Sequence, residues 1–537
     1  MGTTVKRLTA LPLLFALAAC GTQQPAGSTP GTSLTWAVET QPISLNPQQW
    51  AQNKVRLLVF NQFDALLARA EDGSFHPWLA TSWKVSDDGL AYTLDLRQDV
   101  TFHDGTRFDA AAVKANLDQF RVPGYNPAVS SIQLRAFDRA EVVSPYTVKI
   151  TLKERDGLFL DFLASPYAGQ VSPASLKKAK DLKFGGVDLV GTGPFILDRF
   201  VRGQEIHYRR NPAYKWPPAG AAHQGPAYLS ELTYRFLPEA AVRVGALTSG
   251  QVQVVEGVPA TEVGLIEKDP NLALKTSLNS GTSFSYYFNT SRAPFDDQRV
   301  REAFREAVDV DAVLRSVYQG TATRAWSVVG ERSPFYDDSL RDSFGGDTDQ
   351  ANALLDAAGW KQRDAEGFRV KDGARLTVRT VASAPFVRDR RDILAQAIQA
   401  QVKQSAGIDF QVRIVDQGTA QKALDDNEYE IFENSRGDAD VGAALNLILP
   451  GKGAINRTHF ADPRVDRWLA EASATSDQAK RKALYAKVQQ VVVKEKAILF
   501  PIYVPADQVA AQKSVQGLGF DPASGTPAGA YDVRIGT

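Results

Sequence analysis

Strand-like and helix-like segments alternate along nearly the whole chain, and this alternation limits the possible folds more than any other feature. SLTWAVE, from Ser33, and TVKITLK, from Thr147, alternate apolar and polar residues as half-buried strands do. Other segments, such as RDILAQAIQAQVKQSAG from Arg391, carry apolar residues at helical spacing. Strands that alternate with helices on both sides of the middle predict an α/β protein with at least two lobes.

Length and charge narrow the class of protein. A chain of 537 residues predicts two or three domains, since a single core stops growing well below that size. Lys plus Arg and Asp plus Glu number 61 each, so the net charge is zero. This balance offers no general attraction for nucleic acid or an acidic membrane, and we expect no nucleic-acid partner.

The N-terminal segment indicates export. Lys6 and Arg7 precede the short apolar run Leu8–Ala18, which is typical of a secretory signal peptide and too short to span a bilayer comfortably. The only cysteine of the chain, Cys20, follows Leu-Ala-Ala, as in the signal box of a lipoprotein. We therefore expect residues 1–19 to be a lipoprotein signal peptide and Cys20 to carry the lipid. An ordinary signal peptide with a chance cysteine is the alternative.

Residues 20–33 are predicted to be a flexible tether, because they are rich in Gly, Pro, Ser and Thr and have little to bury. A lipidated cysteine, a tether and a globular body describe an exported protein anchored at the outer face of the cytoplasmic membrane, in the periplasm. Several acyl chains hold such a protein firmly, at about 0.8 kcal/mol for each buried CH2 group.

Local signals place several elements of the body. Val55–Arg69 carries apolar residues at helical spacing, and Asp88-Gly89 predicts a hairpin turn between two strands. Asp109 is a good N-cap for a helix with an apolar face that includes Val113 and Leu117.

The stretch TFHDGT raises the question of catalysis. His103 beside Asp104 could form part of an acid–base pair, but the pair Asp104-Gly105 is typical of a tight turn and accounts for the aspartate. The chain contains neither GxSxG nor HExxH, and no two of its five histidines lie three or four positions apart. We therefore expect no catalytic residue, no metal site and no cofactor. A secreted hydrolase that uses His103 and Asp104 is the alternative from another class.

The segment HPWLATSWKVSDDGLAYTLDLRQDVTFHDGTRFDAAAVKANLDQF, residues 76–120, resembles the signature region of the peptide- and nickel-binding solute-binding lipoproteins of ABC importers, extracellular family 5. SLNP at Ser44, GTGPF at Gly191, RRNPAY at Arg209 and APFDDQRVREAFREAVD at Ala293 match further family motifs in order. Nearly the whole body takes part, so the resemblance is specific.

The resemblance implies a two-lobed periplasmic-binding-protein fold of type II, with an extra subdomain inserted in the N-terminal lobe. It implies a monomer that captures a peptide between its lobes and delivers it to a membrane permease; closure follows because only the closed form lets the ligand touch both lobes. The expected divisions are lobe I at 34–281 plus 503–537, its inserted subdomain at 57–190, and lobe II at 282–502.

The resemblance also implies ligand-binding residues. In peptide-binding relatives an aspartate of the second lobe pairs with the ammonium group of the peptide, and the corresponding stretch here is ENSRGDADVGAALN. Arg436 could neutralise these acids or reach a ligand carboxylate, and the segment SFSYYFN could offer a strand edge. The expected ligand-binding residues are Asp438, Asp440, Arg436, Tyr287, Ile43 and Ser44.

Two departures from the family pattern bear on the ligand. The proline that usually follows the Gly-Asp loop is missing, and Ala384 stands where some dipeptide binders carry arginine. The rival ligand is a nickel chelate or another small solute. Residues 224–458 contain no histidine, so His459 is the one imidazole available in lobe II. A peptide is the favoured ligand.

Overall fold

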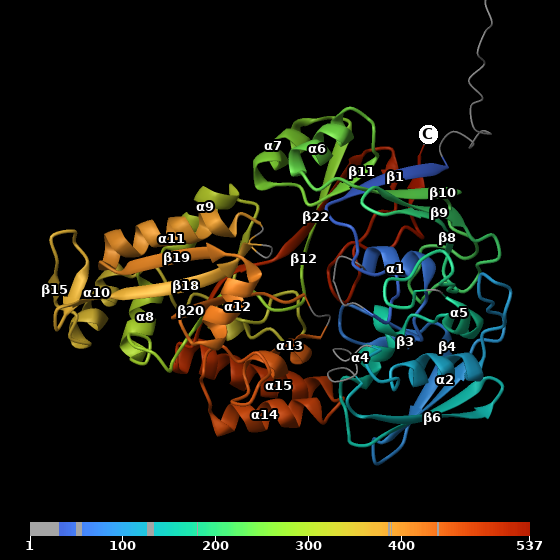
Figure 1. Ribbon diagram of the computed structural model, residues 1–537, viewed down its shortest axis with the longest axis horizontal. Helices are drawn as coiled ribbons and strands as arrows, with labels where there is room; N and C mark the ends of the chain where they lie inside the picture. Colours follow the sequence, from blue (N-terminus) through green and yellow to red (C-terminus); the bar gives the residue numbers. More distant parts are fainter. Residues whose placement is uncertain are drawn as a thin grey trace, which may run out of the picture.

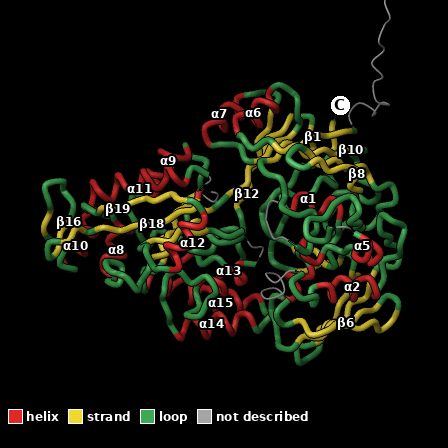
Figure 2. Tube along the Cα trace, viewed as in Figure 1, coloured by secondary structure: helices red, strands yellow, loops and turns green. Residues whose placement is uncertain are grey.

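The computed structural model describes residues 32–49, 56–125, 134–179, 181–384, 387, 389–437 and 440–536. Two large sheets organise two lobes, which lie side by side in Figure 1 and in the secondary-structure view of Figure 2. We call lobe I the part that carries the seven-stranded and four-stranded sheets, and lobe II the part that carries the six-stranded sheet.

The seven-stranded sheet of lobe I joins segments from both ends of the chain. Its strands, in spatial order, are β12 (Leu272–Leu278), β22 (Ala506–Gln512), β11 (Val254–Glu256), β1 (Ser33–Val38), β10 (Glu231–Phe236), β9 (Glu205–Arg210) and β8 (Phe195–Val201). The helices α6 (Ala240–Thr248) and α7 (Ala260–Lys268) pack beside it. The buried aromatic side chains Trp36 and Tyr234 belong to the main core of this lobe.

The four-stranded antiparallel sheet forms the lower part of lobe I in Figure 1. Its strands, in spatial order, are β4 (Ala80–Val85), β5 (Ala91–Leu96), β7 (Thr147–Leu152) and β6 (Phe137–Ser144). The helix α2 (Ala110–Gln119) packs on it. The helices α4 (Phe159–Leu163) and α5 (Pro173–Lys178) and the hairpin of β2 (Leu67–Arg69) and β3 (Phe75–Pro77) complete this part of the lobe, whereas α1 (Arg56–Gln62) contacts β8. Gly89 has a φ of 70° at the turn between β4 and β5, and Asp109 caps α2 by accepting from the Ala112 amide.

The six-stranded sheet of lobe II is mixed. In spatial order it contains β14 (Thr323–Arg324), β21 (Leu499–Val504), β13 (Phe284–Phe288), β20 (Ile431–Asn434), β18 (Thr377–Ser383) and β19 (Asp409–Val415). The strands β20, β18 and β19 are parallel, whereas β13 and β21 run antiparallel to their neighbours. The carboxyl ends of β18 and β20 therefore lie at the same edge of the sheet.

Helices cover this sheet and extend the lobe. They are α8 (Gln298–Glu306), α9 (Val310–Tyr318), α10 (Thr348–Ala357), α11 (Arg391–Ala406), α12 (Gln417–Asp425), α13 (Val441–Ile448), α14 (Pro463–Ser473) and α15 (Gln478–Gln489), which continues as a π-helix over Gln490–Glu495. The small sheet of β15 (Gln362–Arg363), β16 (Arg369–Lys371) and β17 (Ala374–Arg375) lies at the far end, and β23 (Val515–Gln516) pairs with β24 (Arg534–Ile535) in lobe I.

The chain crosses between the two large sheets twice, once between β12 and β13 and once between β21 and β22. The two crossings lie together, because the Asn279 amide donates to the Pro505 carbonyl at 2.8 Å. Two short adjacent connections of this kind are typical of a hinge between lobes.

The helical spacing of Val55–Arg69 extends further than the helix. The helix α1 ends at Gln62, and Leu67–Arg69 instead form the strand β2. The buried Asp64 carboxylate lies between them and accepts from Thr192 Oγ1 at 2.8 Å and from Trp216 Nε1 at 3.0 Å. These tertiary contacts outweigh the local periodicity, and they leave Arg69 at the end of a strand.

Candidate ligand-binding site

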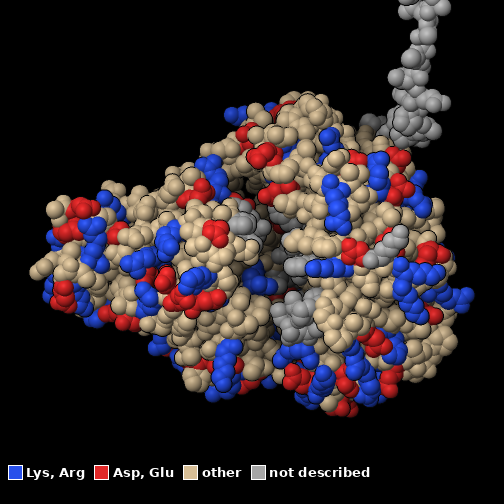
Figure 3. Space-filling model, in the orientation of Figure 1, with Lys and Arg blue, Asp and Glu red and all other residues tan. Residues whose placement is uncertain are grey.

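The surface is hollowed where the two lobes meet (Figure 3). On the lobe II side, the carboxyl ends of the adjacent parallel strands β18 and β20 meet the beginning of β13. Crevices outside the carboxyl ends of parallel strands are the usual ligand sites of open α/β sheets. This edge is therefore the candidate position of the ligand-binding residues of lobe II.

Buried polar atoms gather at the same edge. Within the described residues, the hydroxyl groups of Ser283, Tyr286, Tyr287 and Ser383 are buried and have no hydrogen-bond partner. Buried polar atoms in proteins almost always have a partner, either in the protein or in a bound molecule. Ser283 directly precedes β13 and Ser383 ends β18, so a molecule bound at this edge can complete these hydroxyl groups.

The segment after β20 packs directly on the start of β13. The Thr282 amide donates to the Arg436 carbonyl at 2.7 Å, and the Arg436 amide donates back to Thr282 Oγ1 at 2.8 Å. A side chain at Gly281 would place its Cβ 1.9 Å from the Arg436 carbonyl oxygen, so only glycine allows this approach. Burial raises the pKa of the Tyr287 hydroxyl and nearby Arg436 opposes the shift, so two predicted site residues lie close together.

Arg391, the first residue of α11, is buried beside these elements and contacts several of them. Its Nε donates to the Tyr503 hydroxyl at 3.0 Å and its Nη2 donates to Ser435 Oγ at 2.8 Å. Its guanidinium carbon lies 4.3 Å from the centre of the Phe284 ring. Sequence reasoning missed this residue, although one signal was present: a cation at the positive N-terminal end of a helix dipole is unfavourable and needs another reason to be there.

Asp440 belongs to a buried cluster of four charged side chains that joins the lobes. Its Oδ1 accepts from Arg481 Nη2 of α15 at 2.8 Å, and its Oδ2 accepts from Arg69 Nη2 of lobe I at 3.2 Å. Arg69 also forms an ion pair with Asp161 of α4. We call Arg69, Asp161, Asp440 and Arg481 the cross-lobe cluster, which contains two basic and two acidic side chains.

The cross-lobe cluster shifts the pKa values of its two acids in opposite directions. Burial would raise the pKa of Asp440, but Arg481 and Arg69 outweigh it and hold the pKa below its usual value. Burial dominates at Asp161 and raises its pKa, although Arg69 opposes the shift. Asp440 Oδ1 also accepts from the Gly442 amide at 2.8 Å at the start of α13. Both oxygens of Asp440 are thus engaged by protein groups, and its role as a ligand-binding residue stays a prediction.

The remaining predicted residues are dispersed. Ser44 is buried in lobe I, where its Oγ accepts from the Asn46 amide at 2.9 Å, whereas Ile43 is 41% exposed. Asp438 and the predicted lipid-attachment residue Cys20 lie outside the described residues. The structure therefore brings Tyr287 and Arg436 together at the edge of lobe II and leaves Ser44 in a turn of lobe I.

The HDG turn has structural contacts. His103 Nε2 donates to the Gly193 carbonyl at 2.9 Å, and the His103 amide donates to the Gly191 carbonyl at 2.9 Å. Asp104 accepts from the Thr106 amide at 3.0 Å and from Ser172 Oγ at 2.6 Å. The turn ties the GTGPF loop to the four-stranded part of lobe I, and the contacts of His103 run to backbone carbonyls rather than to Asp104.

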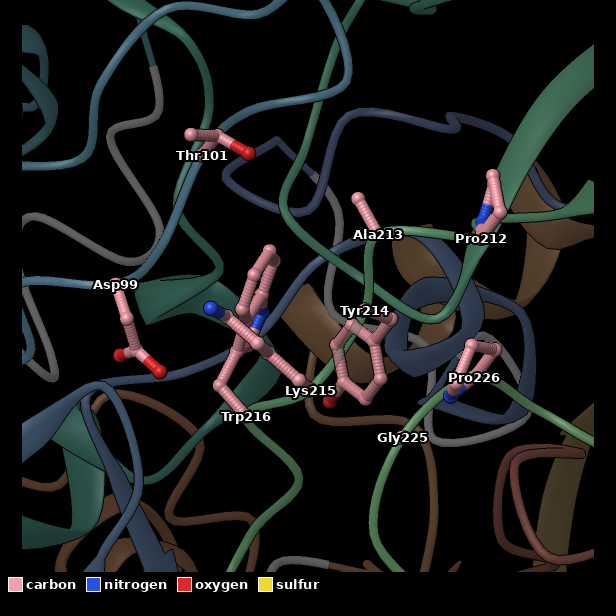
Figure 4. A pocket seen from close by; sticks show the side chains of 9 residues that line it. All are labelled: Asp99, Thr101, Pro212, Ala213, Tyr214, Lys215, Trp216, Gly225 and Pro226. Carbon is pink, nitrogen blue, oxygen red and sulfur yellow. The ribbon is translucent and has the colours of Figure 1, made fainter.

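A separate pocket of about 500 Å³ opens on lobe I (Figure 4). Its lining comes from lobe I alone: Asp99, Thr101, Pro212, Ala213, Tyr214, Lys215, Trp216, Gly225 and Pro226. The polar atoms of its two aromatic residues are already used, because Tyr214 OH and Trp216 Nε1 donate to Asp64 at 3.1 and 3.0 Å. This pocket has the features of a surface depression over the core.

In the part of the chain that the structure covers, no helix combines the length and apolar character that a membrane span requires.

Comparison with known proteins identifies a family to which the chain is similar. The sequence model described as "Bacterial extracellular solute-binding proteins, family 5 Middle" matches residues 74–452. The glutathione-binding protein GsiB of Escherichia coli K12 is 30% identical over 461 residues, which cover 83% of this chain and 84% of that protein. GsiB of Salmonella paratyphi A is 28% identical over 505 residues, which cover 91% and 92%.

Solved structures share the fold. NikA from Brucella suis in complex with Fe(III)-EDTA has a TM-score of 0.82 at 24% identity and covers 94% of this chain and 99% of that chain. The dipeptide binding protein from Pseudoalteromonas sp. SM9913 in complex with Met-Leu has a TM-score of 0.75 at 22% identity, with coverages of 94% and 100%. These likenesses confirm the two-lobed α/β fold of a type II periplasmic binding protein. Together with the family match over most of its length, they show that the chain belongs to the bacterial extracellular solute-binding proteins of family 5.

Proposed function

We propose that this chain is the peptide-binding lipoprotein of an ABC importer, which captures a peptide between its two lobes and delivers it to a membrane permease. The observation that carries the proposal is the set of buried, unpaired hydroxyl groups at the ends of β13 and β18, among the described residues, beside the hollow between the lobes. A peptide brings amide, ammonium and carboxylate groups, which are suited to complete such a surface.

Relatives support a peptide-like ligand. GsiB is described as a glutathione-binding protein, and glutathione is a tripeptide. The hydroxyl groups of Ser283, Tyr287 and Ser383 can each donate or accept, so they suit the alternating donors and acceptors of a peptide backbone. A nickel chelate or another small solute is the alternative within the family, and the experiment below separates the two.

The same proposal covers the cell biology of the chain. Cys20 would carry the lipid, residues 20–33 would form the tether, and the body would act as a monomer at the outer face of the cytoplasmic membrane. The hinge would lie between β12 and β13 and between β21 and β22, close to the expected lobe boundaries at residues 281 and 503. The role is binding rather than catalysis, because the contacts of His103 and Asp104 hold a turn together.

Native mass spectrometry of the exported protein, purified without added ligand, tests the proposal. We expect co-purified peptides, and added peptide at 100 times its Kd should stabilise the fold by about 2.7 kcal/mol. A nickel-dependent mass, or stabilisation by a nickel–histidine complex and not by a peptide library, would replace peptide by chelate. The variant Cys20→Ser, compared with the parent, should move from the membrane fraction to the soluble fraction.

A further inference from the structure

We propose that Glu433 is the side chain that binds the ammonium group of the ligand, a role that the family resemblance implies for Asp438 or Asp440. This inference rests on the proposed function and adds the chemical group that the site selects. It makes Glu433 a specificity-determining residue, which favours ligands with a free amino group.

Glu433 stands at the ligand edge of lobe II. It is the third residue of the four-residue strand β20, at the carboxyl end of the parallel strands, and it is paired with Tyr286 of β13 in the antiparallel register. Its side chain is partly exposed, whereas Tyr286 opposite is fully buried. A partly exposed carboxylate at this edge can be reached from the hollow between the lobes.

The partly exposed Glu433 carboxylate differs from the buried acids Glu430 and Asp440 of lobe II because it lacks a partner. Across the described residues it forms no hydrogen bond and no ion pair. Glu430, on the same segment, accepts from the Arg379 amide at 2.8 Å and from Arg292 Nε at 3.1 Å. Asp440 is likewise held by two arginines. The fold thus satisfies its structural acids and leaves this one open.

The surroundings of Glu433 prepare it for a cation. Burial raises the pKa of its carboxyl and the charge of Arg391 opposes the shift, so a bound cation would stabilise the ionised form. Arg391 is held in place by Tyr503 and Ser435 and is not itself an ion-pair partner of Glu433 within the described chain. The buried, unpaired Tyr286 hydroxyl lies near Glu433 and can accept a second hydrogen bond from the same cation.

An ammonium group fits this arrangement better than other cations do. It is compact and carries up to three donors, which matches one carboxylate and one hydroxyl at a strand end. A metal ion would need a larger set of ligands, and the described residues contain no group of three His, Cys, Asp or Glu side chains placed to hold one. The backbone beside the site is strained, since the consecutive residues Asp389 and Arg390 have φ values of 55° and 58°, and strain of this kind concentrates at functional sites.

A comparison of two peptide libraries tests the inference. A mixture of dipeptides to pentapeptides with free N-termini and the same mixture after N-acetylation are each added to the full-length protein, and thermal stabilisation and the captured peptides are measured. We expect the parent to be stabilised by the free-amine library and to lose at least tenfold in affinity for the acetylated one. Glu433→Gln keeps the shape of the side chain and removes its charge. This variant should bind the free-amine library at least tenfold more weakly than the parent does, and it should no longer distinguish the two libraries.

Each outcome is informative. If the parent binds both libraries equally, or if Glu433→Gln keeps its preference for free amines, the inference fails while peptide binding stands. If neither library stabilises the parent, the proposed peptide function itself fails. Glu433→Asp keeps the charge and should retain a preference for free amines, and circular dichroism of each variant shows that it is folded. Should Glu433→Gln not fold, Asp438→Asn decides: an unchanged preference for free amines supports Glu433, and loss of that preference assigns the ammonium group to Asp438 and overturns the inference.

Discussion

Replacing Asp440 with Asn would remove one charge from the cross-lobe cluster and leave the shape of the side chain unchanged. Asn can still accept from the Gly442 amide and begin α13, so the local structure of lobe II should survive. The variant loses the attraction of lobe II for Arg69 of lobe I, and it also removes the charged partner of the buried Arg481 within lobe II. We therefore expect Asp440→Asn to shift the protein toward a more open arrangement of its lobes.

The magnitude follows from the geometry of the contact. Charges 3.2 Å apart attract by about 5 kcal/mol at an effective dielectric constant of about 20. Removing both side chains from water on closure cancels much of this attraction. When the lobes separate, Arg69 keeps Asp161 and Asp440 keeps Arg481, so within the cross-lobe cluster opening breaks only the contact between Arg69 and Asp440. We expect a net coupling of about 1–2 kcal/mol, or about 5- to 30-fold in the closing equilibrium.

A double-mutant cycle measures this coupling. The parent, Asp440→Asn, Arg69→Gln and the double variant are compared by small-angle scattering without ligand and by calorimetric titration with the peptide identified by mass spectrometry. Each single variant should increase the radius of gyration and weaken binding, and the double variant should be little worse than either single one. The matched control is Glu71→Gln, which removes the exposed cross-lobe ion pair with Arg332 at 3.1 Å and should cost less than about 1 kcal/mol.

Two results would refute the reasoning. A coupling below about 0.3 kcal/mol would mean that Arg69 and Asp440 act independently. A loss of binding in Asp440→Asn without any change in the radius of gyration, and without coupling to Arg69, would instead place Asp440 in the ligand site, as the sequence pattern suggests.

Three further predictions follow from single contacts. Burial lowers the pKa of His103 to about 4, so the imidazole stays neutral in the fold while the unfolded chain gains a proton near pH 6.5. The free energy of unfolding should then be intact above pH 6.5 and fall by up to about 3 kcal/mol toward pH 4. Denaturant titrations of the parent and of His103→Gln at several pH values measure the free energy of unfolding. An equal fall of this free energy with pH in both proteins would contradict the prediction. Gly281→Ala would place Cβ 1.9 Å from the Arg436 carbonyl oxygen and should abolish peptide binding by displacing the segment after β20; unchanged affinity by calorimetry would count against the proposed edge. Gly157→Ala would place Cβ 2.3 Å from the Thr475 carbonyl oxygen of lobe II, so scattering should show more open lobes, and an unchanged radius of gyration would contradict it.

The elements that sequence predicts well are those whose signals are local. The alternation of Ser33–Val38, the turn at Gly89 and the cap at Asp109 depend on neighbours a few positions away, and the structure has all three. The helical spacing of Val55–Arg69 misleads, because burial of Asp64 against distant residues ends the helix at Gln62. Local patterns cannot report such contacts.

The site was harder to predict for the same reason. Arg69 and Asp440 lie 371 positions apart, and no local pattern connects them. The loop of the family's type points to Asp440, but its contacts depend on distant residues: Arg481 reaches it from a helix that follows much later. Sequence does not point to Glu433, because an acid in a strand usually faces solvent and its lack of a partner is visible only in three dimensions.

The cross-lobe cluster and the strand edge of lobe II suggest how closure can depend on a ligand. A buried charge without a partner costs several kcal/mol. If opening of the lobes left a charge in that condition, this cost would hold the lobes shut. Opening leaves no charge of the cross-lobe cluster without a partner, because each lobe retains its own ion pair: Arg69 with Asp161 and Asp440 with Arg481. The cluster can therefore favour the correct closed geometry without locking it. A ligand shifts such an equilibrium only by its differential affinity, and a full switch needs about 5.5 kcal/mol. The cross-lobe contact, at about 1–2 kcal/mol, belongs to the ligand-free equilibrium, so contacts at Glu433 and the neighbouring hydroxyl groups must supply the differential affinity of the ligand. Loss of the ligand's ammonium group should therefore reduce closure as well as affinity.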